Sequence, residues 1–150
     1  MDADLLVVPF FKAHDASPLD LTLRRRSPRG IRAQGATEAY DLGTVEDREN
    51  IAQALILRLM TPRGSLRALG HANYGSLLYR LIGELKTEAA RNLCRAYVLE
   101  VVAQEPRVHP AAVAFTFDLA SETASSLAFT LEVQPRMFEE TVTLDLELLL

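Results

Sequence analysis

A change of hydrophobic period at Pro106 constrains the fold of this 150-residue chain more than any other feature. Before it, residues 87–104 place apolar side chains at helical spacing. After Arg107, apolar residues alternate with polar ones. Because proline cannot donate to the helical ladder, the helix must end there, which leaves Glu105 and Arg107 at a rigid junction. On the residues alone, the triplet is either a helix stop with two exposed charges or a rigid contact point for a partner.

Three runs of period two follow this junction. Each places apolar side chains on one face and mainly threonine or acidic side chains on the other. The runs are joined by Ser/Thr-rich residues 120–126 and by residues 135–140. The pattern predicts an antiparallel meander with one dry and one wet face. The expected dry face comprises Val113, Phe115, Phe117, Leu119, Leu127, Phe129, Leu131, Val133, Val142, Leu144, Leu146 and Leu148.

Helical patterns precede the strands. In the first of them, Glu46 and Asp47 would occupy the first turn, where acidic side chains complement the helix dipole. That helix is apolar nearly all round, so we expect it to be covered on more than one side, in part by another chain. Cys94 falls on the apolar face of the last helix and is expected to be a small core residue. The predicted helices cover residues 44–60 with Thr44 as the cap, residues 77–81 with Ser76 as the cap, and residues 87–104.

These patterns predict an α+β fold, in which an antiparallel β-sheet is packed on one face by two long α-helices plus a short helix. We expect an N-terminal arm at residues 1–18 and a single domain at residues 19–150. The apolar residues 5–11 of the arm would pack back on the body or add to a partner. Residues 19–23 alternate like a short strand.

Charge and cysteine content exclude several classes of protein. The net charge of −4 gives no global attraction to nucleic acid, and the one cysteine excludes an internal disulfide framework. No apolar run is long enough to span a membrane, so we expect a cytoplasmic protein. The Arg24–Arg32 loop carries five arginines. It is expected to be solvated or to meet an acidic protein neighbour, and a nucleic-acid site is the alternative.

The sequence offers little support for catalysis. His14, His71 and His109 are widely separated, and no HxxxH or CxxC spacing occurs, so we expect neither a metal nor another cofactor. A spatial Ser/His/Asp triad stays open, although no serine lies in a GxSxG elbow. A glycosidase would need two carboxylates, one with a raised pKa. Glu105 is a weak candidate because Arg107 would favour its ionised form. We therefore expect the chain not to be an enzyme.

Six short motifs follow one another in order along the chain. They are Asn50-Ile51-Ala52-Gln53-Ala54-Leu55, Arg58-Leu59-Met60-Thr61-Pro62-Arg63-Gly64-Ser65-Leu66, Leu69-Gly70, Asn73-Tyr74-Gly75-Ser76, Leu81-Ile82-Gly83-Glu84 and Glu105-Pro106-Arg107. This ordered set resembles the baseplate wedge family of contractile phage tails, and the resemblance covers about residues 40–150. Relatives of that family occur in type VI secretion systems and extracellular contractile injection systems, and its members are also called lysozyme-like.

The resemblance implies a structural role as the sheath initiator of a baseplate. Six such subunits would surround the tail tube, join the wedge core and offer a sheet to which sheath subunits add strands. The expected partners are the sheath subunit and other wedge subunits, with the tube or hub as a further candidate, and neither nucleic acid nor membrane. A peptidoglycan hydrolase is the alternative. The partner-binding candidates are Glu105, Pro106, Arg107, Arg63, Tyr74, Leu146 and Leu148.

Overall fold

The computed structural model describes residues 48–150 except Phe138, together with the backbone of Asp47 and of six short strands before it. The chain divides into two compact units, Met1–Asn50 and Ile51–Leu150. Residue 18 is not among the described residues, so the expected boundary between arm and domain stays a prediction.

In the first unit, the described residues form three antiparallel two-stranded ribbons. Their pairings are β1 (Asp4–Leu5) with β6 (Thr44–Val45), β2 (Val7–Pro9) with β3 (Leu19–Leu21), and β4 (Leu23–Arg25) with β5 (Tyr40–Leu42). The expected strand at residues 19–23 is thus found as parts of β3 and β4. The prediction of Thr44 as a helix cap is wrong, because Thr44 pairs with Leu5 in a strand. Most of the Arg24–Arg32 loop and part of residues 5–11 lie outside the described residues.

The second unit contains the predicted meander. Strands β7 (Val108–Phe117), β8 (Ser126–Pro135) and β9 (Val142–Leu149) form an antiparallel sheet in the order β7-β8-β9. The alternation predicted the facing of the side chains well, since Leu127, Leu131 and Val133 are fully buried. Leu119 is an exception: it follows the end of β7 and is 69% exposed, so its assignment to the dry face is wrong.

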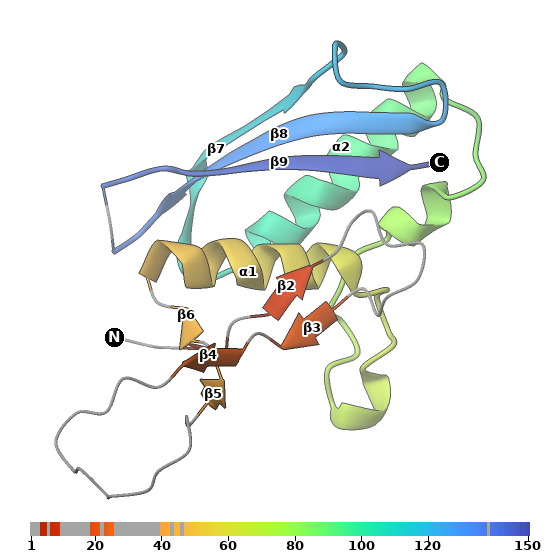
Figure 1. Ribbon diagram of the computed structural model, residues 1–150. Helices are drawn as coiled ribbons and strands as arrows, with labels where there is room; N and C mark the ends of the chain where they lie inside the picture. The colour runs from red at the N-terminus through yellow and green to blue at the C-terminus, as the bar shows by residue number, and fades with distance from the viewer. Residues whose placement is uncertain are drawn as a thin grey trace, which may run out of the picture. The chain divides into compact units, whose positions relative to one another are not determined.

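Both long helices lie on the same face of the sheet, which confirms the α+β class (Figure 1). They are α1 (Asp47–Met60) and α2 (Glu88–Ala103), and the N-cap of α2 is Thr87, whose hydroxyl accepts a hydrogen bond from the Ala90 N–H. The expected short α-helix is instead a 3-10 turn, η2 (Leu78–Leu81), and a second 3-10 turn, η1 (Arg67–Leu69), precedes it. The Ser76 hydroxyl does accept a hydrogen bond from the Leu78 N–H, close to the predicted cap.

The core of the second unit lies between the helices and the dry face of the sheet. Cys94 is fully buried there, as predicted, and burial raises the pKa of its thiol to about 12. None of the described helices is long and apolar enough to cross a membrane. The core comprises Ile51, Leu55, Leu59, Leu78, Leu81, Cys94, Val98, Val101, Val102, Val108, Leu127, Phe129, Leu131, Val133, Val142 and Leu144.

Candidate functional site

The residues after α2 form one tight turn that contains the predicted triplet. The Glu105 N–H donates to the Val102 carbonyl at 3.0 Å, which closes the helix, and the Val108 N–H donates to the Glu105 carbonyl at 3.1 Å. Pro106 is exposed at the tip of this turn. The helix stop is therefore confirmed, and β7 begins two residues after the proline.

The Glu105 carboxylate is buried and ion-paired. Only 4% of the residue is exposed, so the expectation of two exposed charges is wrong for Glu105. Its Oε1 accepts a hydrogen bond from Arg107 Nε at 2.7 Å, and the Arg107 backbone N–H lies 3.3 Å from the same oxygen. Arg58 Nη2, from α1, lies 3.8 Å from its Oε2. Two arginines from distant parts of the sequence thus share one carboxylate.

These contacts decide the charge state of Glu105. Burial alone would raise its pKa, because it disfavours the charged form. The hydrogen bonds and charge of Arg107, with the charge of Arg58, outweigh burial and lower the pKa below its ordinary value. Glu105 is consequently ionised at neutral pH. This confirms the expected effect of Arg107 and makes Glu105 unsuited to general-acid chemistry.

Arg58 connects this turn to Tyr74, which is another of the predicted partner-binding residues. Its guanidinium carbon lies 4.9 Å from the centroid of the Tyr74 ring, a cation–π contact. The Arg58 side chain is 16% exposed, and its Nε is buried without a hydrogen-bond partner. Sequence reasoning missed Arg58 as a site residue. The available signal was a charge near the end of a helix whose residues 51–60 are otherwise apolar except for Gln53.

Arg63 occupies a loop that folds back on the end of α1. The Arg63 N–H donates to the Ser76 carbonyl at 2.8 Å, and the Ser76 hydroxyl donates to the Leu59 carbonyl at 2.6 Å. The Arg63 side chain reaches α2, where its Nη1 lies 2.8 Å from Glu100 Oε1. Its Nε and Nη2 are buried without hydrogen-bond partners. Arg63 thus belongs to a second ion pair, separate from that of Glu105.

The structure places Leu146 and Leu148, the remaining predicted residues, on β9. Their side chains are half-buried and pack against the core. They are paired with β8 through Phe129 and Leu127. Among the described strands, β9 therefore leaves accessible its outer backbone edge and the exposed part of these side chains, and not a free apolar face.

The described residues give little support for hydrolysis. A pocket of about 410 Å³ lies by η2 and the start of α2, but Glu84 is the one carboxyl group in its lining, whereas a glycosidase needs two. No group of three metal-ligating side chains occurs among these residues. Where the pKa of a carboxyl group in this part of the chain shifts, at Glu105, Asp118 and Glu122, it shifts downward. The pocket is lined by Arg80, Leu81, Glu84, Leu85, Thr87, Ala89, Ala90, Leu93 and Tyr97.

Comparison with known proteins identifies a similar fold. No family model and no curated protein matches the sequence. Among solved structures, the chain is similar to a protein from Geobacter sulfurreducens described as a "putative tail lysozyme". The TM-score is 0.56 and the identity 19%, and the match covers 68% of this chain and 89% of the other. The two chains therefore share a fold.

Proposed function

We propose that this chain is a non-catalytic component of the baseplate of a contractile injection machine, where it joins wedge subunits and templates the sheath by strand addition. The observation that carries the proposal is an open three-stranded sheet, with an unpaired outer edge on β7 and on β9 among the described strands, in a fold shared with a protein named for a tail. Open edges of this kind accept strands from other chains.

The turn at Glu105 supports the docking part of the proposal. Arg58 and Arg107 both face the carboxylate of Glu105, so two guanidinium groups are held at this turn. The Arg107 side chain is 33% exposed, and Pro106 holds the turn rigid. A charged group that is already positioned loses little conformational freedom when it binds. The turn therefore suits an acidic segment of a neighbouring subunit.

Co-expression with candidate sheath and wedge subunits, followed by imaging of the assemblies, tests this function. We expect Arg107→Glu to abolish sheath assembly, because it reverses the exposed charge of the turn. Since Arg107 also pairs with Glu105, the free energy of unfolding of the monomer must be measured alongside. Arg67→Glu, an equal change at an exposed position in η1, is the matched control. Normal sheath length and yield with Arg107→Glu would count heavily against the proposal.

A peptidoglycan hydrolase is the second candidate, favoured by the name of the structural neighbour. The buried and ionised Glu105 argues against it, since a glycosidase acid needs a raised pKa. Clearing of a cell-wall suspension by the purified protein, lost in Glu105→Gln, would establish this alternative.

A further inference from the structure

In each edge strand, the backbone N–H and C=O groups of alternate residues point away from the sheet. The backbone hydrogen bonds show which residues these are. The Leu150 N–H donates to the Ser125 carbonyl at 2.8 Å, in the same register as the eight pairs between β8 and β9. In an antiparallel ladder, directly opposed residues alternate between bonded and non-bonded pairs. The even-numbered residues of β9 therefore bond to β8, whereas Thr143, Asp145, Glu147 and Leu149 direct their backbone N–H and C=O groups to the outer edge.

The same reasoning gives the outer edge of β7. The Asp118 N–H donates to the Ala128 carbonyl at 2.9 Å, in register with the pairs between β7 and β8. The backbone groups of Val113, Phe115 and Phe117 are therefore the ones directed outward. Both edges are free of other strands in the part of the chain that the structure describes.

The edge of β7 carries features that oppose strand addition. Its register shifts between Val108 and Val113, a stretch that includes Pro110. Arg95 of α2 lies over the helix-facing side of this strand, with its guanidinium carbon 5.3 Å from the centroid of the Phe115 ring. Irregularity, proline and nearby charged side chains are the usual protections of an edge strand. We expect a new strand to pair poorly there.

The edge of β9 lacks the irregularity and the proline of β7, and the charges that it carries, Asp145 and Glu147, are acidic. Its register with β8 is unbroken over eight pairs, and the strand contains no proline, lysine or arginine. On its inner side, Leu146 and Leu148 stay half-buried, so an added strand would complete their burial. The edge of β9 therefore offers a regular row of backbone hydrogen-bonding groups, and the apolar side chains beside it are only partly covered.

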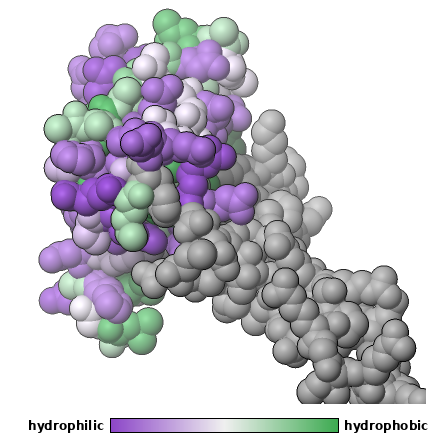
Figure 2. All heavy atoms as spheres, turned by 90° about the vertical axis from the view of Figure 1, so that its left-hand side faces the viewer, coloured by the Kyte–Doolittle hydropathy of each residue, from purple (hydrophilic) through white to green (hydrophobic). Residues whose placement is uncertain are grey.

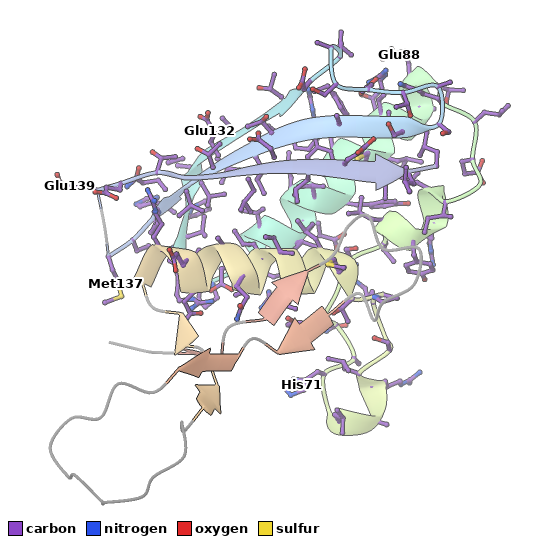
Figure 3. All side chains as sticks on the ribbon, viewed as in Figure 1. His71, Glu88, Glu132, Met137 and Glu139 are labelled. Carbon is purple, nitrogen blue, oxygen red and sulfur yellow. The ribbon has the colours of Figure 1, made fainter. Side chains whose placement is uncertain are left out.

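The wet face beside this edge is acidic. Glu132, Asp145 and Glu147 project from β8 and β9 on the side away from the helices, and neither strand carries a basic side chain. Figure 3 shows Glu132 on that side, and Glu139 at the turn that joins the two strands. Figure 2 shows that the end of the molecule with this turn is mostly hydrophilic. Because Asp145 and Glu147 lie on the edge strand, an antiparallel strand paired with β9 would place side chains directly opposite them on the wet face.

We propose that β9, and not β7, is the edge that accepts a foreign strand, and that the strand it accepts alternates apolar with basic residues. The apolar residues cover Leu146 and Leu148, and the basic residues lie across from Asp145 and Glu147. The inference rests on the proposed function for the identity of the partner as a sheath subunit, but the edge and its charge preference follow from the described residues.

Two blocked peptides of eight residues test this preference with the full chain. In one, valine alternates with lysine; in the other, valine alternates with glutamate. We expect the lysine peptide to shift the backbone amide NMR signals of Thr143, Asp145 and Glu147, and to bind about tenfold more tightly than the glutamate peptide. Asp145→Lys/Glu147→Lys should reverse the preference. Glu139→Lys/Glu140→Lys makes the same change of net charge off the strand and should preserve it.

A proline variant tests the backbone contribution separately. Because the Thr143 N–H is directed outward, Thr143→Pro removes no hydrogen bond to β8 and should weaken both peptides while the chain stays folded. The inference is overturned if the shifts map to Val113, Phe115 and Phe117, if both peptides bind equally, or if neither binds at millimolar concentration. Sheath assembly that survives Asp145→Lys/Glu147→Lys and Thr143→Pro would overturn the inference alone. Peptide binding at β9 without any sheath assembly would overturn the proposed function alone.

Discussion

At the scale of single residues, Glu122 makes the clearest pH-dependent contribution to stability. It lies in the turn between β7 and β8 with a side chain only 4% exposed. Arg91 donates to both of its oxygens at 2.6 Å, and Lys86 Nζ lies 2.7 Å from one of them. The hydrogen bonds of Arg91, opposed by burial and assisted by Lys86, lower the pKa of Glu122 from 4.5 to about 2. This stabilisation is therefore present above pH 4.5 and is lost as the pH falls towards 2.

Glu122→Gln should lower the free energy of unfolding at pH 7 by about 1.5–3 kcal/mol, because it removes charge-assisted hydrogen bonds between a buried carboxylate and the partly buried Arg91. It should also flatten the loss of stability between pH 5 and pH 2, measured by urea unfolding across that range. Glu88→Gln is the matched control: Glu88 faces the same Arg91 at 3.9 Å but its side chain is 88% exposed. An acid dependence that is equal in wild type and Glu122→Gln would refute the assignment.

Gly75 is a second residue whose contribution to stability can be tested directly. Its φ of +104° is unfavourable for other residues, and a Cβ there would lie 2.3 Å from the Thr61 carbonyl oxygen. Gly75→Ala should therefore lower the free energy of unfolding by about 3 kcal/mol or more, from backbone strain and overpacking together. Gly64→Ala, where φ is +90° but no atom lies within 4 Å of the Cβ, should cost about 1 kcal/mol. Thermal unfolding of both variants measures this difference, and equal losses would contradict it.

At the scale of elements, periodicity predicted the strands and the last helix, because their apolar spacing matches their burial. The facing of Leu127, Leu131 and Val133 followed directly from alternation. The helix cap predicted at Thr44 was wrong. A threonine before acidic residues has the pattern of a helix cap, but the backbone of Thr44 pairs with Leu5 in a ribbon. Ion pairs between residues that are far apart in the sequence could not be predicted either. Nothing in the spacing of Arg58 and Glu105, 47 residues apart, indicates their ion pair.

The N-cap of α2 gives a prediction at this scale. The Thr87 hydroxyl accepts a hydrogen bond from the Ala90 N–H at 3.2 Å, so it satisfies one of the helix's unpaired donors. Thr87→Ala should lower the free energy of unfolding by about 1 kcal/mol, and Thr87→Ser should restore most of it. Urea unfolding of the three proteins measures the difference. If alanine and serine are equally destabilising, the hydroxyl does not act as a cap.

At the scale of the whole molecule, charge is distributed unevenly over the second unit. Two arginines, Arg58 and Arg107, lie at the Glu105 turn, while the wet face of the sheet carries Glu132, Asp145 and Glu147. If a subunit binds different neighbours at two surfaces, each surface must bind its own partner and exclude the partner of the other surface. On the proposed function, the arginines of the Glu105 turn and the acidic residues beside the β9 edge would provide that discrimination, because like charges brought together oppose binding.

The ion pairing of the buried carboxylates predicts that the chain does not hydrolyse peptidoglycan. We expect the purified chain to leave a peptidoglycan suspension turbid, because Glu105 is ionised and paired and Glu122 is held by Arg91 and Lys86. Turbidity over hours measures this, with an active lysozyme as the positive control. Glu105→Gln should change the free energy of unfolding and leave the turbidity unchanged. Clearing by the wild type that is lost in Glu105→Gln would instead make the Glu105 turn a catalytic site, and docking would then have to rest on the β9 edge alone.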